Sequence, residues 1–370
     1  MTTATRQKRL RSGVTTGLCA AAAAKAATTM LLTGQLLAQV EAEARTGAVF
    51  TFELLHAQIG QGTATCAVRK DAGDDPDVTN GAEVLATVTK TAAPGITIDG
   101  GAGIGRVTKP GLKVEVGRAA INPVPFEMIK TAIAAACQDK GYSGGLSAVI
   151  SIPGGEELAK RTMNSRLGII GGLSVLGTTG IVEPMSESAI IETIKAEIDV
   201  QLAAGQARLF LVPGNYSRDF ADADPGLKFD PEQAIKCSNY IGETLDYLCL
   251  KGVPDIVLLG HAGKLVKLAA GIMNTHSKMA DGRMEVLAAY SALAGAGPNQ
   301  IRQILGCVTI EAALEVIDRL GIGPAVWSSI GQRIGFHLEQ RTHGQIAIEY
   351  IVFTQEHGVL TRGQVQRASG

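Results

Sequence analysis

Apolar, β-branched runs in the second half of the chain end in glycine-rich loops and alternate with helical segments. The runs cover residues 146–152, 172–176, 208–212 and 255–259, and helical patterns such as 188–203 and 233–251 follow. Repeated strand–loop–helix order predicts a mostly parallel sheet with helices on its faces, because parallel neighbours need a crossover between them. A later run at residues 346–353 is expected to join an edge of this sheet.

The first half follows a different pattern. Residues 18–32 are alanine-rich and predict a helix, since alanine loses no side-chain entropy on becoming helical, and Thr15 or Thr16 is placed to cap it. Two prolines open a second predicted helix at residues 123–136. Predicted strands at 49–54, 63–68, 84–89 and 112–116 are joined by tight turns. This order predicts an antiparallel sheet packed on the first helix.

The change of pattern at residues 141–145 predicts a domain boundary. We expect an α+β domain over residues 1–143, built as a helix-backed antiparallel sheet. A mostly parallel α/β domain with a glycine-loop cofactor site should follow over residues 144–370. A chain of 370 residues is long enough for two domains.

Composition excludes several classes of protein. The chain is 46% hydrophobic with a net charge of −1, as in an ordinary globular protein, and its 4% aromatic content argues against a nucleic-acid partner. No apolar run reaches the length of a membrane span, and no signal core follows the basic N-terminus. The six cysteines form no C-x-x-C pair, which favours free thiols in the cytoplasm. A homo-oligomer is compatible with the sequence.

The glycine loops that end the four runs are the first candidate site. In an open parallel sheet, ligands bind outside the carboxyl ends of the strands, where all four loops would meet. Glycine lets the backbone approach a ligand closely, although glycine is also common in α/β loops that bind nothing. His261 follows a predicted buried strand and suits a ligand hydrogen bond or proton transfer. A capping or surface histidine explains His261 equally well.

Two further turns carry charge. The turn at residues 99–106 lacks the G-x-G-x-x-G spacing of a dinucleotide site, but Arg106, Lys109 and Arg118 beside it suit an anionic ligand. The acidic turn at residues 70–77 lacks the glycine and the closing glutamate of a calcium loop. We interpret it as a solvated charged turn and expect no metal site in the protein.

Longer strings resemble the signature segments of one family. They are LRSGVTTGLCAAAAAK (10–25), KDAGDDPDVT (70–79), GIGRVTKPGL (103–112), AINPVP (120–125), PGGEE (153–157), LGTTGIVEPMS (176–186), GNYSRDF (214–220), KCSN (236–239) and GHAGKLVKLAAGIMNTHS (260–277). The sequence resembles the cobalt-precorrin-5B C-1 methyltransferases of anaerobic cobalamin biosynthesis. The resemblance runs from residue 10 to at least residue 277 and is less sharp after Pro298.

The resemblance implies a reaction and its site. S-adenosylmethionine would give its methyl group to C-1 of cobalt-precorrin-5B, yielding cobalt-precorrin-6A, and the cobalt would belong to the substrate. Such a displacement needs alignment more than a strong base. We expect donor contacts from Gly154, Gly155, Gly177, Thr178, Thr179, Gly180, Glu183, Gly214 and Asn215, with Glu183 at the ribose.

The corrinoid carries several carboxylates and needs cations spread over a wide site. We expect it to lie between the domains, with His261 as a candidate catalytic residue. Its carboxylates should meet Arg106, Lys109, Arg118, Arg218 and Lys264. Two other functions remain open. A phosphate-handling α/β enzyme such as a kinase would need a P-loop, and none is present in the sequence. A non-catalytic tetrapyrrole carrier would bind the corrinoid and ignore S-adenosylmethionine.

Overall fold

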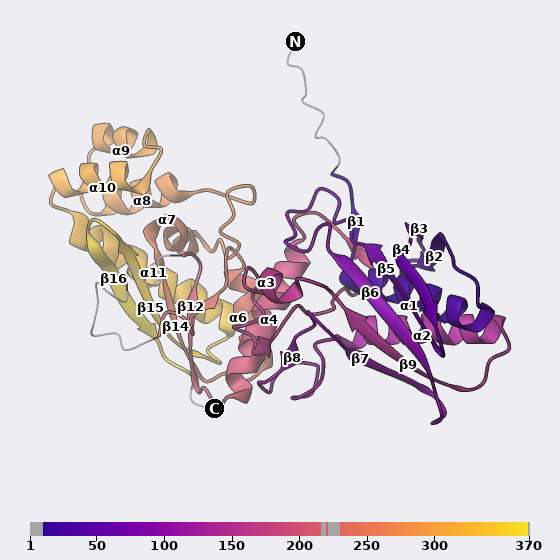
Figure 1. The fold of residues 1–370 in the computed structure, drawn as a ribbon. Helices are drawn as coiled ribbons and strands as arrows, with labels where there is room; N and C mark the ends of the chain where they lie inside the picture. The colour runs from indigo at the N-terminus through magenta and orange to yellow at the C-terminus, as the bar shows by residue number, and fades with distance from the viewer. Residues whose placement is uncertain (1–9, 216–219, 221–229, 369–370) are drawn as a thin grey trace, which may run out of the picture. The chain divides into compact units, whose positions relative to one another are not determined.

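The computed structural model describes residues 10–215, 220 and 230–368, and the chain divides into two compact units, Met1–Glu187 and Ser188–Gly370 (Figure 1). The division comes later than the predicted boundary at residues 141–145. The reason is strand β9 (Gly145–Ser151), which pairs with strands of the first unit. The expectation that residues 146–152 join the second sheet is therefore wrong, although the strand itself is present.

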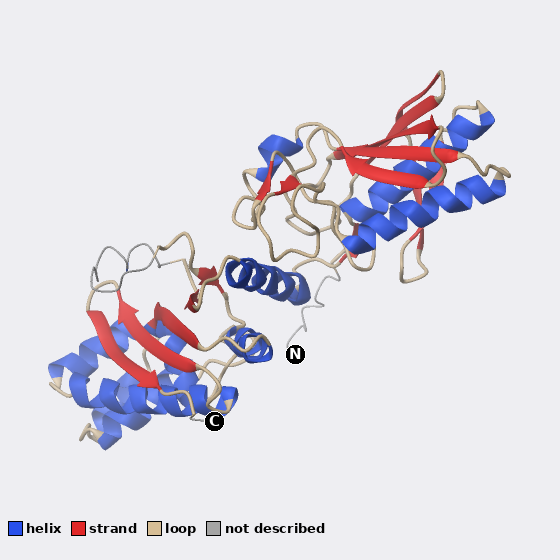
Figure 2. Cartoon of the chain, turned by 90° about the horizontal axis from the view of Figure 1, so that it is seen from below, coloured by secondary structure: helices blue, strands red, loops and turns tan. Residues whose placement is uncertain are grey.

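The main sheet of the first unit is mostly antiparallel. Its strands are, in spatial order, β4 (Leu55–Gly60), β5 (Thr63–Arg69), β6 (Glu83–Thr91), β9 and β7 (Ile96–Gly100). Only the pairing of β7 with β9 is parallel among these described strands. Helices α1 (Thr16–Thr33) and α2 (Pro123–Asp139) cover one face of the sheet (Figure 2). The predicted helix-backed antiparallel sheet is present in this unit.

Helix α1 is buried along almost its whole length. The Thr15 hydroxyl accepts a hydrogen bond from the Leu18 amide at 3.2 Å, and Gly34 ends the helix with a φ of 71°. Small side chains let neighbours come close, since a Cβ on Gly17 would lie 2.8 Å from the Pro125 ring. The predicted helix and its cap are confirmed, and apolar burial on all sides stabilises α1.

Short elements complete the first unit. They are the pairs β1 (Gly13–Val14) with β11 (Ile181–Val182), β2 (Gln39–Glu43) with β3 (Val49–Glu53) and β8 (Arg106–Val107) with β10 (Ile169–Ile170), and helix α3 (Gly155–Ala159). The predicted strand at 112–116 is instead a series of turns, because Gly111 and Gly117 at its ends adopt positive φ. The predicted strand at 172–176 forms only isolated bridges, through Leu173 and Val175.

The second unit contains the predicted parallel sheet. Its strands are, in spatial order, β13 (Ile235–Lys236), β12 (Arg208–Val212), β14 (Asp255–His261), β15 (Ala347–Thr354) and β16 (Gly358–Val365). All neighbours are parallel except β15 and β16. The prediction that residues 346–353 lie at an edge is wrong, because β16 pairs outside β15.

Helices pack against this sheet around one apolar core. They are α4 (Glu187–Ala203), α6 (Ile241–Leu250), α7 (Ala262–Leu265), the 3-10 helix η1 (Val266–Ala270), α8 (Arg283–Leu293), α9 (Pro298–Leu305), α10 (Ile310–Arg319) and α11 (Gly323–Thr342). Helix α4 confirms the prediction at 188–203, whereas the predicted helix at 233–251 begins only at Ile241. Among the described residues, no helix combines the length and apolar character that a membrane crossing needs.

Candidate functional site

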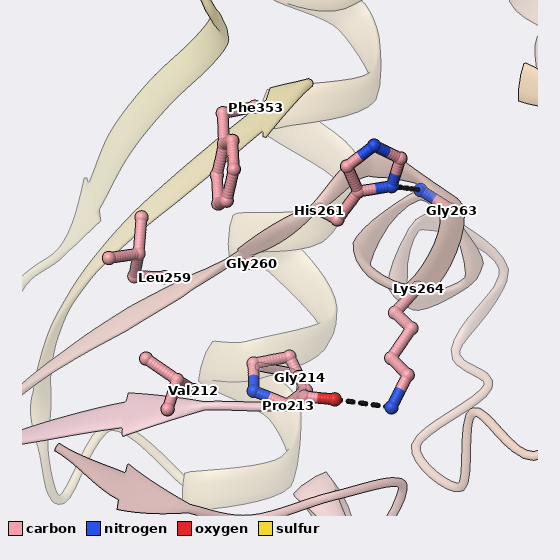
Figure 3. A pocket seen from close by; sticks show the side chains of 9 residues that line it. All are labelled: Val212, Pro213, Gly214, Leu259, Gly260, His261, Gly263, Lys264 and Phe353. Atoms are coloured by element: carbon pink, nitrogen blue, oxygen red, sulfur yellow. Dashed lines mark hydrogen bonds between the residues drawn. The ribbon is translucent and has the colours of Figure 1, made fainter. Parts of the chain in front are cut away.

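A pocket of about 180 Å³ opens at the carboxyl ends of β12, β14 and β15 (Figure 3). We call it the strand-end pocket, and it is lined by Val212, Pro213, Gly214, Leu259, Gly260, His261, Gly263, Lys264 and Phe353. β13 and β14 lie on opposite sides of β12, so the direction of chain progression reverses here. Ligands of open α/β sheets bind at such a switch point.

Lys264 holds two loops of the pocket together. Its ammonium donates a hydrogen bond to the carbonyl of Pro213, after β12 (Figure 3). It donates a second one, at 3.3 Å, to the carbonyl of Ser238, after β13. Burial lowers the pKa of Lys264 from its usual value, although the nearby Cys237 opposes this. The side chain therefore fixes the pocket and also brings a positive charge to it.

His261 ends β14 and caps α7. Its Nδ1 accepts a hydrogen bond from the Gly263 amide at 3.1 Å, so the neutral ring carries its proton on Nε2. Nε2 lies 3.6 Å from Oε1 of Glu311, beyond hydrogen-bond length. Burial lowers the pKa of His261, and Glu311 acts against that shift. The capping role is confirmed, and the ring is set up as a donor rather than as a base.

The glycine loops of the first unit contact their own unit. A Cβ on Gly155 would lie 2.3 Å from the Gly103 carbonyl oxygen, and one on Gly177 would lie 2.5 Å from Cβ of Thr15. The Gly180 carbonyl accepts from the Thr15 amide at 3.0 Å. The prediction that all four loops meet at one sheet edge is wrong, because β9 and the segments up to residue 187 belong to the first unit.

Other predicted donor contacts lie as follows. Gly154 caps α3 with a φ of 76° and has open space beside its Cα. Thr178 and Glu183 are exposed, whereas Gly214 is half-exposed and lines the strand-end pocket. Asn215 is exposed next to Gly214. The structure thus brings part of the predicted donor set to each unit.

The predicted substrate cations are distributed in the same way. Arg106 forms a two-pronged ion pair with Asp99, with N–O distances of 2.8 and 2.9 Å. This pair lowers the pKa of Asp99. The stem of Lys109 packs against Gly168, and Arg118 lies close enough to Asp99 to act on its carboxylate. Arg106, Lys109 and Arg118 belong to the first unit and Lys264 to the second, and Arg218 lies outside the described residues.

The acidic turn at residues 70–77 is not simply solvated. Its Asp71 pairs with Arg11, with one N–O distance of 2.8 Å, and Asp74 accepts from the Arg11 amide at 2.7 Å. Lys70 is 2% exposed and pairs with Asp77 at 2.6 Å. The turn therefore holds the segment that leads into α1 through hydrogen bonds and an ion pair with Arg11. Sequence reasoning missed this role.

A larger groove of about 610 Å³ lies in the first unit, between α1, α2 and the end of β2. We call it the helix groove, and it is lined by Ala21, Lys25, Ala42, Glu43, Ala44, Arg45, Pro123, Val124, Glu127, Met128, Thr131, Ala132 and Ala135. Its volume falls in the range of small-molecule sites, roughly 300–1,000 Å³. Sequence reasoning missed this groove, although Lys25 interrupts the alanine run in a way that could have drawn attention to it.

Metal ligands do not gather in the parts of the chain that the structure describes. Over those residues, no group of three or more His, Cys, Asp or Glu side chains is arranged to hold an ion. The expectation that cobalt belongs to the substrate stays a prediction.

Known proteins match the chain over both units. A family model described as CbiD matches residues 3–184, and one described as CbiD, C-terminal domain, matches residues 274–364. A cobalt-precorrin-5B C(1)-methyltransferase of Ruminiclostridium cellulolyticum is 48% identical over 347 residues, which are 94% of this chain and 90% of the relative. A protein of the same name from Moorella thermoacetica is 44% identical over 362 residues, 97% of each chain.

A solved structure gives a further match. The cobalamin biosynthesis protein (cbiD) of Archaeoglobus fulgidus is 30% identical, with a TM-score of 0.40 over 74% of this chain and 84% of the other. The sequence identities to the curated relatives, which extend through both units, are far above what the fold class alone would give. They confirm the resemblance seen in the signature strings: the chain belongs to the CbiD family.

Proposed function

We propose that the chain is an S-adenosylmethionine-dependent methyltransferase that methylates C-1 of cobalt-precorrin-5B to give cobalt-precorrin-6A. The support is the family membership, together with relatives of that name that are 48% and 44% identical over nearly the full chain. The proposed setting is the cytoplasm, which fits six cysteines that are all unpaired thiols in the described chain.

The observation that best supports a role for the strand-end pocket is its charge. Lys264 brings an ammonium group to it, and among the described lining residues none carries a carboxylate. A positive sulfonium would find no carboxylate among these lining residues, whereas an anionic group would be attracted to Lys264. We therefore assign the strand-end pocket to a carboxylate arm of the corrinoid, which the sequence also predicted for Lys264.

The size of the pocket agrees with that assignment. A cavity of about 180 Å³ suits an acetate or propionate arm rather than a whole macrocycle or a whole S-adenosylmethionine. Gly214, predicted as a donor contact, would then lie beside the arm. The Lys264 ammonium has three N–H groups and donates to two carbonyls of the described chain, which leaves a donor for the arm.

His261 has a donor role in this proposal. With Nδ1 occupied by the Gly263 amide, the neutral ring can offer a hydrogen bond only through Nε2. When bound, S-adenosylmethionine supplies a methyl group on a charged sulfur, and transfer breaks that carbon–sulfur bond and forms a carbon–carbon bond at C-1. Such a displacement depends on alignment, and His261 would contribute to it by orienting a carboxylate of the corrinoid.

The test is a methyl-transfer assay with cobalt-precorrin-5B and methyl-labelled S-adenosylmethionine, read by the mass of the corrinoid. We expect Lys264→Met to raise the KM for the corrinoid about tenfold or more, since a charged hydrogen bond in a partly buried site is lost. Lys278→Met, at an exposed lysine of the same unit, should behave as the wild type. A wild-type chain that binds the corrinoid but transfers no label would instead be a carrier.

A further inference from the structure

We infer that the helix groove of the first unit is the binding site for the methyl donor, S-adenosylmethionine. Glu43 and Glu127 would face its positive groups, and Arg45 and Lys25 its carboxylate. The inference rests on the proposed function and adds a site to it.

Room for a whole donor molecule is the first argument. The groove has a volume of about 610 Å³, against about 180 Å³ for the strand-end pocket. Only the larger of these two falls within the roughly 300–1,000 Å³ typical of small-molecule sites.

Small apolar side chains line part of the groove. Ala21 of α1, Ala42 of β2 and Ala44 just after β2 are buried, and each of these side chains is a single methyl group. On α2, Val124 and Met128 lie one turn apart and line the same side. Small side chains below and longer ones beside them suit a flat aromatic ring such as adenine, which gains free energy from apolar contact.

The charges around the groove match the donor in sign. Lys25 and Arg45 are positive, and Glu43 and Glu127 are negative. Within the described chain none of these four side chains forms an ion pair, and the Lys25 ammonium donates to the Glu41 carbonyl at 2.9 Å. S-adenosylmethionine carries a carboxylate, an ammonium and a sulfonium, so it can use both signs. Among the described residues that line the strand-end pocket, none has a carboxylate that could pair with the sulfonium.

The loop at residues 177–180 borders this groove. The Arg45 amide donates to the Thr179 carbonyl at 3.0 Å. A Cβ on Gly180 would lie 3.0 Å from that of Ala44 and 3.5 Å from the Met128 methyl carbon. The loop therefore holds the Arg45 backbone and packs Gly180 against Ala44, and its Thr178 and Thr179 are exposed. The sequence predicted that this loop contacts S-adenosylmethionine at the end of a strand. We keep the contact in the proposal, but because the loop borders the helix groove.

The first test fills the groove. Binding of S-adenosylmethionine and of S-adenosylhomocysteine to the full chain is measured by calorimetry for Ala132→Leu and for Ala134→Leu. Both alanines lie on α2, but only Ala132 lines the groove, while Ala134 is exposed elsewhere on the helix. We expect Ala132→Leu to weaken both ligands at least tenfold and Ala134→Leu to change neither.

The second test uses the charge that separates the two ligands. Glu127→Gln should weaken S-adenosylmethionine about two- to fivefold more than the neutral thioether S-adenosylhomocysteine, as expected for an exposed charge pair. Glu53→Gln, at an exposed glutamate of the same unit outside the groove, is the matched control and should alter neither affinity.

The outcomes separate the site from the function. If Ala132→Leu and Glu127→Gln bind both ligands as tightly as an active wild type does, the helix groove is refuted and the methyltransferase function stands. If the wild type binds neither ligand and transfers no methyl group, both the proposed function and the proposed donor site are refuted.

Discussion

Replacing Gly177 by alanine should destabilise the first unit far more than the same replacement at a glycine with open space beside it. Gly177 has a φ of 129°, a region that residues with a Cβ rarely adopt, and its added Cβ would lie 2.5 Å from the Thr15 side chain. The backbone strain costs about 2 kcal/mol. Displacing Thr15 breaks the cap of α1, at about 1 kcal/mol. We therefore expect Gly177→Ala to lower the free energy of unfolding by about 3 kcal/mol.

Urea unfolding followed by circular dichroism measures this loss. Gly117→Ala is the matched control, because Gly117 has a φ of 88° and no atom within 4 Å of its added Cβ, so only about 1 kcal/mol of strain applies. In Thr15→Gly all the side-chain atoms that clash are gone, and the double variant should lose less than the sum of the single losses. Equal losses in Gly177→Ala and Gly117→Ala would contradict the packing argument.

Two further predictions concern charged groups. Lys70→Met should cost about 3 kcal/mol, since the half-buried Asp77 carboxylate loses its partner. Arg11→Met, at an exposed pair, should cost much less, and urea midpoints of the two variants compare them directly. Burial lowers the pKa of His261, so the unfolded state binds more protons below pH 6.5. Stability of the second unit should therefore fall as the pH drops below 6.5, and His261→Asn, which retains a capping side chain, should reduce that fall. Fluorescence of Trp327, in α11, reports the transition, and identical pH slopes in both proteins would count against the assignment.

Local elements were predictable because their causes are local. The alanine run and Thr15 specify α1, and the prolines at 123 and 125 specify the start of α2. The partner of β9 was not predictable in the same way, because an apolar run shows that a strand is buried and not which strand lies beside it. The alternation of strands and helices in fact begins earlier, since β7, α2 and β9 form a parallel crossover within the first unit.

The site was predicted less well, for a related reason. Glycines such as Gly103 and Gly155 permit close approach, and sequence alone does not say whether a ligand or another part of the chain approaches. Here another part of the chain approaches, since a Cβ added to Gly103 would lie only 1.9 Å from the Ile152 carbonyl oxygen. The helix groove escaped notice because its charged residues come from separate segments, and only the fold places Lys25 and Glu127 around one cavity.

The burial of α1 determines which part of the protein is free to change. Its methyl groups touch the sheet or α2 on nearly every side, so a larger residue there would displace neighbours and destabilise the first unit. The groove-facing positions of α2, such as Thr131 and Ala135, are exposed and lack this constraint. Because α1 also lines the groove through Ala21 and Lys25, it is the exposed positions of α2 that mutation and selection can change to alter what the groove accepts, while the buried alanines of α1 keep the fold.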